Sequence, residues 1–255
     1  MDEPVVWRSR VLASFGYRAV FFGREGGVSR GPLESLNLGA YVDDDPAALA
    51  ENERRVLAHL GVNGLYLPRQ VHGDRAELLN EPVTGVVRGP EADAVVAKTA
   101  RLAGGALGVL TADCTPILIG SQDGEAMAAV HAGWRGLLAG VIGRAIQRLT
   151  RAFGVPPGEL AAAIGPTVGA PEYEVSAELA NRFLRERLDL LGVIWPDRRR
   201  KPHLDLRLIA LKDLLAAGLP GESVEIVGPS TADPRLFSHR RSGGRSGRQV
   251  SAIAK

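Results

Sequence analysis

The feature that most constrains the fold of this chain is the irregular order of its strand-like and helix-like segments. Short apolar runs bounded by turn residues recur along the sequence, and such runs are typical of buried strands. A few longer segments instead repeat apolar residues with the period of an amphipathic helix. Because the two kinds of segment are mixed without strict alternation, the pattern favours an α+β fold with mixed sheets over a doubly wound parallel sheet.

The expected elements can be placed by residue number. We expect strands within 5–22 and at 65–67, 76–79, 92–97, 106–110, 117–119, 126–130, 160–164, 223–227 and 248–253, the last two flanking a Gly/Arg-rich hairpin. We expect helices at 46–60, 136–153, 176–190 and 204–217, with the basic run Arg198–Lys201 between the last two. No internal repeat and no long linker divides the sequence, which predicts a single domain over residues 1–255.

Two of the expected helices carry clear local signals. An acidic cluster at 43–45 followed by Pro46 is typical of a helix start, and Gly61 is typical of a helix end. The apolar face of this helix would consist of Leu49, Val56, Leu57 and Leu60. The inward face of the helix at 136–153 would consist of Val141, Ile142, Ala145, Ile146 and Leu149.

Composition limits the class of protein. The 255 residues are 45% hydrophobic and 24% charged, which is ordinary for a soluble globular chain. A net charge of +2 and an aromatic content of 5% argue against nucleic-acid and membrane partners. The single cysteine, the acidic start Met1–Pro4 and the lack of an apolar run of about 18–20 residues predict a soluble cytoplasmic protein.

The single cysteine stands in an unusual context. Cys114 follows the strand-like run 106–110, between the polar residues Asp113 and Thr115, and Pro116 would end a regular strand ladder on that side. Reactive groups are often held where a strand opens into a loop. The alternative is that Cys114 is a small buried hydrophobe, which is the usual role of a lone cysteine.

Two histidines have comparable positions. His131 ends the run 126–130 and is followed by the small residues Ala132 and Gly133, which permit close approach of a ligand. His72 lies in a loop between two expected strands. A hydrogen-bonded core histidine and a solvated surface histidine are the respective alternatives, since the spacing of the three residues is no local zinc signature.

If Cys114, His72 and His131 converge, they would form an open zinc site with three protein ligands. One thiolate and two neutral imidazoles would leave the Zn²⁺ ion with a net charge of about +1, which attracts phosphate or hydroxide and lowers the pKa of a bound water. Asp93 and Asp113 could orient the ligands or carry protons, or could be ordinary turn carboxylates.

Arginines supply a second set of candidates, because guanidinium groups suit phosphate and carboxylate. Arg55 lies on the helix at 46–60, and Arg135 follows His131 closely. A further cluster near the C-terminus consists of Arg240, Arg241, Arg245 and Arg248. For most of that cluster we expect a solvated basic hairpin.

Several motifs together resemble the YfiH, or laccase-domain, family, which has long been labelled multi-copper polyphenol oxidoreductase. They occur in order along nearly the whole chain. The motifs are Gly26–Ser29, Ser35–Gly39, Arg69–Gly73, Ala92–Ala94, Thr111–Cys114, His131–Gly136, Ile164–Pro166, Tyr173–Val175 and Phe237–Arg241.

The resemblance implies a single-domain layered α/β/β/α sandwich with mixed sheets and a zinc site formed by His72, Cys114 and His131. It implies phosphorolysis of adenosine, inosine, guanosine and methylthioadenosine, together with deamination of adenosine. Members of the family act on purine nucleosides and inorganic phosphate. By this resemblance Ser29, Asn37 and Arg55 would lie around the substrate or phosphate. The departures at Tyr41–Asp43, Thr167 and Ser230, where family members often have other residues, affect the expected substrate preference and leave the triad intact.

We therefore expect catalytic roles for His72, Cys114, His131, Arg55 and Asp93. We expect substrate or phosphate contacts for Ser29, Asn37, Arg55 and Arg135. Zinc is the expected cofactor, with copper as an adventitious or alternative metal.

Three other functions stay open from the residues alone. A copper-dependent polyphenol oxidase is disfavoured, because five histidines are too few for a multi-copper centre once His59 and His203 fall elsewhere. A metal-free cysteine hydrolase could use Cys114 with His131. A binding module would hold a nucleoside without turnover. The oligomeric state is left open.

Overall fold

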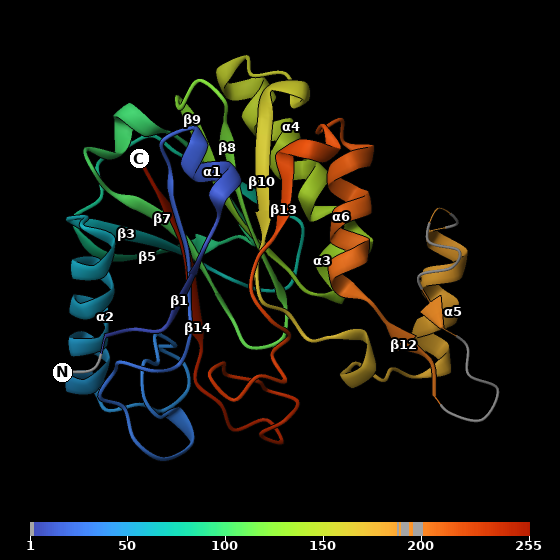
Figure 1. Cartoon of the computed structure of the whole chain (residues 1–255), viewed down its shortest axis with the longest axis horizontal. Helices are drawn as coiled ribbons and strands as arrows, with labels where there is room; N and C mark the ends of the chain where they lie inside the picture. The colour runs from blue at the N-terminus through green and yellow to red at the C-terminus, as the bar shows by residue number, and fades with distance from the viewer. Residues whose placement is uncertain (1–2, 188, 190–193, 196–200) are drawn as a thin grey trace.

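Two six-stranded sheets stacked face to face form the centre of the molecule, and helices cover their outer faces (Figure 1). The computed structural model describes residues 3–187, 189, 194–195 and 201–255. The strands are β1 Val6–Arg8, β2 Arg18–Phe22, β3 Gly64–Arg69, β4 Ala76–Leu79, β5 Gly85–Glu91, β6 Ala94–Lys98, β7 Ala106–Thr111, β8 Thr115–Ser121, β9 Ala126–Ala132, β10 Leu160–Ile164, β11 Ile194–Trp195, β12 His203–Leu204, β13 Val224–Ile226 and β14 Gln249–Ala254. The helices are α1 Arg10–Ser14, α2 Pro46–Leu60, α3 Trp134–Ala139, α4 Val141–Phe153, α5 Ala177–Glu186 and α6 Leu206–Ala216.

Both large sheets are mixed. The first has the order β1-β2-β14-β7-β3-β5 and the second β13-β10-β8-β9-β6-β4. In the first sheet β14 pairs antiparallel with β2 and β7, while β3 pairs parallel with β5 and β7. In the second, β8 pairs antiparallel with β9 and β10, and β6 pairs parallel with β4. The expected layered α/β/β/α sandwich with mixed sheets is therefore confirmed.

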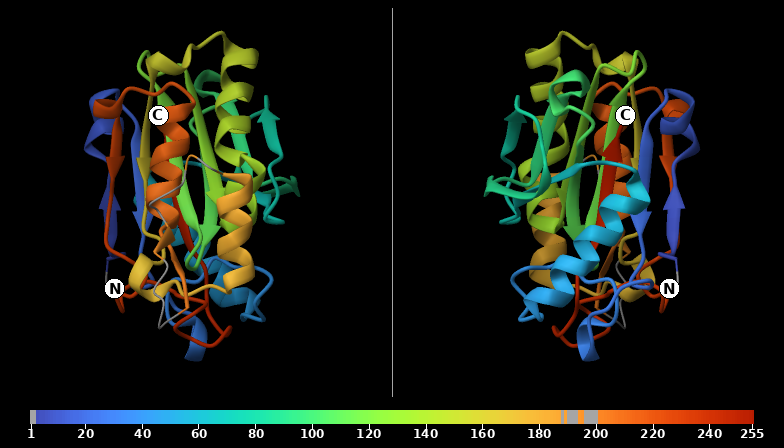
Figure 2. Two further views of the ribbon diagram at one scale, coloured as in Figure 1. Left: turned by 90° about the vertical axis from the view of Figure 1, so that its right-hand side faces the viewer. Right: turned by 90° about the vertical axis from the view of Figure 1, so that its left-hand side faces the viewer.

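The core is divided into layers by the sheets. The layer between the two sheets is filled by apolar side chains of both, among them Phe21 and Val109 from the first and Leu118 and Ala129 from the second. Helix α2 covers the first sheet, whereas α4 and α6 cover the second (Figure 2). Because each sheet is covered on both faces, its strands consist largely of continuous apolar runs.

Helix α2 forms as its local signals predict. Asp45 is the N-cap and accepts a hydrogen bond from the backbone N–H of Ala47, and Pro46 occupies the first turn. Gly61 ends the helix with φ +63, a conformation that favours glycine. The inner face, however, buries the polar Asn52 beside its apolar residues, which the apolar pattern did not predict.

Three expectations about the elements were wrong. The stretch 5–22 contains α1 between its strands, and β5 was not predicted at all. The expected helix 136–153 is two helices, because Gly140 adopts φ +82 between α3 and α4. The five residues predicted for its inward face are nevertheless all buried on α4.

Two further expectations also differ from the structure. Pro116 does not end a ladder but lies within β8, opposite His131 of β9. The segments at 223–227 and 248–253 do not flank a hairpin, because β13 pairs with β10 in one sheet and β14 with β2 and β7 in the other.

The remaining helices follow the expected ranges approximately. Helix α5 ends at Glu186, short of the expected 190, and residues 188 and 190 lie outside the described residues. Arg198–Arg200 of the basic run also lie outside them. Among the described residues, no helix combines the length and the apolar character that crossing a membrane requires.

Candidate metal and nucleoside site

Cys114, His131 and His72 converge at one end of the sandwich. Cys114 lies where the chain crosses from β7 in the first sheet to β8 in the second, and His72 lies where it crosses from β3 to β4. His131 is at the end of β9, which pairs with β8 next to Cys114. The potential ligand atoms of the three side chains all lie within 4.8 Å of one another. We call these three residues the His–Cys–His cluster.

Asp93 orients this cluster. Its carboxylate is fully buried and lies 2.8 Å from Nδ1 of His131. It also accepts hydrogen bonds from the backbone N–H groups of Val71, His72 and Gly73, at 3.2, 2.9 and 2.6 Å. Because a carboxylate with these partners acts as an acceptor, Nδ1 of His131 carries the proton and Nε2 is left for Cys114 or a metal ion.

The cluster favours a thiolate. Desolvation opposes ionisation of Cys114, but the neighbouring imidazoles of His131 and His72 outweigh it and lower the pKa of the thiol to about 6. For His131, desolvation lowers the pKa of the imidazole, but the negative charges of Cys114 and Asp93 outweigh this and raise the pKa to about 9. Both shifts therefore favour a thiolate beside an imidazolium when no metal ion is bound.

The backbone around the cluster leaves little spare room. A Cβ atom on Gly133 would lie 2.9 Å from Sγ of Cys114 and 3.1 Å from Cδ2 of His72, so any larger residue there would displace two members of the cluster. His72 and Asp113 adopt left-handed φ values of +62 and +98. Such conformations cost free energy in residues other than glycine and are concentrated at functional sites.

Asp113 connects the cluster to the C-terminal loop. One carboxylate oxygen accepts a hydrogen bond from the hydroxyl of Thr231 at 2.6 Å, and the other accepts one from the backbone N–H of Arg240 at 2.7 Å. Both interactions join residues more than a hundred positions apart in the sequence. Asp113 thus fixes the loop that carries Arg240 directly beside Cys114.

A hollow of about 460 Å³ opens above Cys114 and His131. Tyr173, Arg240 and Arg248 belong to its lining, and the guanidinium of Arg240 stacks on the ring of Tyr173 at 4.8 Å. Burial raises the pKa of the Tyr173 hydroxyl to about 12, which keeps it a hydrogen-bond donor at neutral pH. The hollow therefore offers an aromatic ring, a phenol donor and two cations next to the cluster.

A wider groove of about 1070 Å³ adjoins this hollow. Tyr41, Val42 and Arg248 line both, and Tyr41 is 75% exposed. Of the C-terminal arginines, which were expected to be mostly solvated, Arg240 is exposed but lines the hollow beside the cluster, and Arg248 is partly buried and also lines it. Arg245 is exposed in the adjoining groove.

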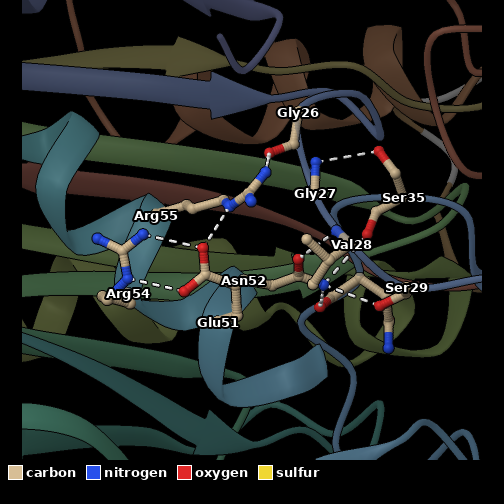
Figure 3. A network of polar contacts seen from close by, with 10 residues as sticks. Gly26, Gly27, Val28, Ser29, Ser35, Glu51, Asn52, Arg54 and Arg55 are labelled. Carbon is tan, nitrogen blue, oxygen red and sulfur yellow. Dashed lines mark hydrogen bonds and ion pairs between the residues drawn. The ribbon is translucent and has the colours of Figure 1, made fainter. Parts of the chain in front are cut away.

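Ser29 and Asn37 belong to a separate buried network. The amide of Asn52 donates to the hydroxyl of Ser29 at 2.8 Å and to the backbone carbonyl of Asn37 at 2.9 Å, and its oxygen accepts from Val28 N–H (Figure 3). Ser29 and Asn37 both donate to the carboxylate of Asp44, at 2.6 and 2.7 Å. We call this group the Asn52 network.

Asn37 is also linked to the lining of the hollow, because its side-chain oxygen accepts a hydrogen bond of 2.9 Å from the backbone N–H of Arg248. Arg55 lies on the other side of the Asn52 network, where Nε contacts Glu51 and Nη1 donates to the carbonyl of Gly26 (Figure 3). The linings of the hollow and of the groove do not include Arg55, Ser29 or Asn37. Direct contact of these three with a substrate stays a prediction.

Residues that the sequence reasoning did not single out also shape the site. The amide of Gln70 exchanges two hydrogen bonds with the backbone of Leu110, both 2.7 Å long, and so ties the His72 loop to β7. Tyr173 and Asn52 were not proposed either. Gln70 and Tyr173 lie within the motifs of the family resemblance, whereas only burial reveals the role of Asn52.

The donor set of the cluster fits a metal ion of the zinc type. Zinc prefers thiolate and imidazole ligands, and three ligands leave a position open. In a tetrahedral site the ligand atoms lie roughly 3.5 Å apart, so modest closure of a group already within 4.8 Å would suffice. No second group of three potential metal-binding side chains occurs among the described residues.

The chain is similar to known proteins over most of its length. The model of the family described as multi-copper polyphenol oxidoreductase laccase matches residues 18–255. A purine nucleoside phosphorylase of Mycobacterium tuberculosis is 38% identical over 227 residues, covering 88% of this chain and 86% of that protein. One of Pseudomonas aeruginosa is 35% identical over 237 residues, covering 92% of each.

Among solved structures, the Bacillus licheniformis hypothetical protein YfiH is similar with a TM-score of 0.85 and 25% identity, covering 94% of this chain and 92% of that one. The family match spans every strand of the two large sheets except β1, and it includes every residue of the His–Cys–His cluster. The chain therefore belongs to the YfiH family, whose model carries the description multi-copper polyphenol oxidoreductase laccase.

Proposed function

We propose that this protein is a zinc-dependent purine nucleoside phosphorylase. The observation that carries the proposal is the convergence of His72, Cys114 and His131 beside a hollow lined by an aromatic ring and two arginines. Relatives at 35–38% identity over most of their length are named purine nucleoside phosphorylases. The substrates would be a purine nucleoside and inorganic phosphate.

The reaction replaces one bond to C1′ of the ribose by another. An oxygen of phosphate bonds to C1′, the bond between C1′ and the purine nitrogen breaks, and the purine leaves with the electron pair and takes a proton. A metal ion held by the cluster would supply a Lewis acid that polarises bound substrate and makes nearby water more acidic. Asp93 would keep His131 in one tautomer and orientation throughout.

The side chains of the hollow would bind and orient the nucleoside. The ring of Tyr173 offers a flat apolar face, and its hydroxyl can donate to the ribose or the base. Arg240 and Arg248 would stabilise negative charge that develops on the leaving purine. Adenosine, inosine, guanosine and methylthioadenosine are the substrates that we propose, together with deamination of adenosine at the same site.

A second candidate function has its own observation. Cys114, His131 and Asp93 form a chain of thiolate, imidazolium and carboxylate, which is the arrangement of a metal-free cysteine hydrolase. His72 distinguishes the two readings, because a hydrolase needs no third ligand, whereas a zinc site uses it. A copper oxidase is less well supported, since His239 is the only further histidine that lines the hollow.

Metal analysis and a phosphorolysis assay test the proposal together. Purified protein should hold about one zinc per chain and release purine base from nucleosides only when phosphate is present. Cys114→Ala and His131→Gln should each lose zinc and at least a hundredfold in turnover. His59→Gln is the matched control, because His59 lies on α2 and contacts Arg8 outside the hollow.

The outcomes separate the candidates. Full zinc loading without turnover of any purine nucleoside would refute the proposed activity. Metal-free protein whose Cys114 reacts with iodoacetamide at neutral pH would favour the hydrolase. Because a thiolate ligand must stay reduced, we propose that the protein acts in the cytoplasm.

A further inference from the structure

A second hollow meets the His–Cys–His cluster at His72. It has a volume of about 340 Å³ and is lined by His72, Arg135, Leu138, Ala139, Arg182 and Glu186. His72 also lines the larger hollow above Cys114. The other walls of that hollow come from β3, β7, the end of β9, the segment 39–42, Tyr173 and the C-terminal loop. The walls of the second hollow come instead from α3 and α5. The cluster is therefore bordered by two spaces with different walls.

The second hollow has an excess of positive charge. Two guanidinium groups, those of Arg135 and Arg182, face one carboxylate, that of Glu186. Glu186 engages only Nε of Arg182, at 2.7 Å, and among the described residues Arg182 forms no other hydrogen bond. Arg135 stacks on the ring of Trp134 at 4.4 Å and forms no hydrogen bond within the same part of the chain. The terminal amino groups of both arginines are thus available to an oxyanion.

Phosphorolysis needs two substrates that reach C1′ from different directions. The phosphate oxygen forms its bond on the face of the ribose opposite the departing purine, as in any direct displacement. Two hollows that meet at the metal ligand His72 permit separate approach.

We propose that the hollow between α3 and α5 is the phosphate subsite, with Arg135 and Arg182 as its anion-binding residues. The nucleoside then occupies the larger hollow with Tyr173 and Arg240. This inference rests on the proposed phosphorylase function and adds Arg182 and a separate place of binding for the second substrate. The chemical class of the ligand is a tetrahedral oxyanion, and inorganic phosphate is the probe that tests it.

The experiment measures phosphate binding and phosphate kinetics separately. Zinc-loaded protein is titrated with inorganic phosphate by calorimetry, and the KM values for phosphate and nucleoside are determined in parallel. Arg182→Gln and Arg135→Gln should each weaken phosphate binding about tenfold, as expected for a lost charge-assisted hydrogen bond. The KM for nucleoside should change little. The matched control is Arg185→Gln, which removes the same charge from α5 outside the hollow.

The possible results distinguish the anion subsite from the phosphorylase function. If no nucleoside is turned over but phosphate binds and weakens only in Arg182→Gln and Arg135→Gln, the phosphorylase function fails and the anion subsite stands. If phosphate binding and its KM are unchanged in both variants but weaken in Arg240→Gln, phosphate shares the larger hollow and the inference fails. Absence of phosphate binding to the zinc-loaded wild type also overturns it.

Discussion

Two polar regions of the molecule differ in the direction of their interactions. In the Asn52 network, the buried amide and hydroxyl groups of Asn52, Ser29 and Asn37 bond to one another, to Asp44 and to the backbone. In the His–Cys–His cluster, three side chains direct their ligand atoms toward a common point that borders two hollows. Both regions are held by segments that are distant in sequence.

The difference separates a structural role from a chemical one. Buried polar groups are satisfied by hydrogen bonds in most proteins, and the Asn52 network follows that rule. In the cluster, by contrast, two imidazoles and a thiol lie close together. The backbone beside them adopts left-handed φ values at His72 and Asp113. We therefore expect changes in the network to act on stability and changes in the cluster to act on metal binding.

Asn52→Ala should have the largest effect on stability. The substitution leaves the backbone N–H of Val28 without a partner and removes the hydrogen bond that the hydroxyl of Ser29 accepts from Asn52, although that hydroxyl still donates to Asp44. The free energy of unfolding should fall by about 3 kcal/mol, more than a hundredfold in the folding equilibrium. Urea denaturation measures this loss, and zinc content should be unchanged.

The control for this prediction is Asn63→Ala. Asn63 is exposed, and among the described residues its side chain makes one hydrogen bond, of 3.3 Å, to the carbonyl of Ala103. Its replacement should cost less than about 1 kcal/mol. Loss of zinc in Asn52→Ala at full stability would contradict the division between the two regions.

Asp93→Asn should have the next largest effect and should act on the metal. Asp93 accepts hydrogen bonds from backbone N–H groups and contacts Nδ1 of His131. The amide nitrogen of an asparagine is itself a donor and would face one of these donors, so the tautomer and orientation of His131 would no longer be fixed. Zinc affinity should fall about 10–100-fold, measured by competition with a chelating dye. Asp74→Asn is the control, because Asp74 lies between β3 and β4 in the His72 loop, its side chain is 42% exposed, and it pairs with Arg144 instead of a cluster residue. Equal zinc affinity in Asp93→Asn and the wild type would remove Asp93 from the proposed mechanism.

Glu51→Gln should have the smallest effect, and one that depends on pH. Hydrogen bonds from Arg54 and then Arg55 lower the pKa of Glu51 to about 2 (Figure 3). A carboxylate with a depressed pKa stabilises the fold above its unfolded pKa of about 4.3, and this contribution is lost as the pH falls toward 2. The difference in denaturation midpoint between the wild type and Glu51→Gln should therefore be small at pH 7 and shrink below pH 4.

The control for the pH experiment is Glu34→Gln, which removes one exposed negative charge outside this ion pair. A difference between the wild type and Glu51→Gln that grows as the pH falls would contradict the sign given above. Such a result would mean that the unfolded chain, rather than the helix, stabilises the charged form.

Elements with local signals could be predicted from the sequence. Helix α2 begins and ends as expected, because its cap residues Asp45 and Gly61 act on their own neighbours. Helix α1 could not be predicted, because its first N–H groups and the hydroxyl of Ser9 bond to Glu225 of β13, more than two hundred residues away. Strand β5 lies at the edge of its sheet and contains Gly89 and Pro90, which disfavour strands in isolation.

The sequence by itself determined the chemistry available at the site. It supplied Cys114 and His131 near the ends of apolar runs, His72 in a loop between two strands, small residues after His131, and motifs that identify the family. These properties are local, since they depend on residue type and near neighbours.

Only the tertiary structure decided the geometry. The crossings from β3 to β4 and from β7 to β8 bring His72 and Cys114 to the same end of the sandwich, because both pairs of strands link the same two sheets. Of the two candidate carboxylates, Asp93 and not Asp113 lies within hydrogen-bond distance of His131, and only the fold shows this. Such selection depends on contacts between distant segments, which no spacing of residues along the chain encodes.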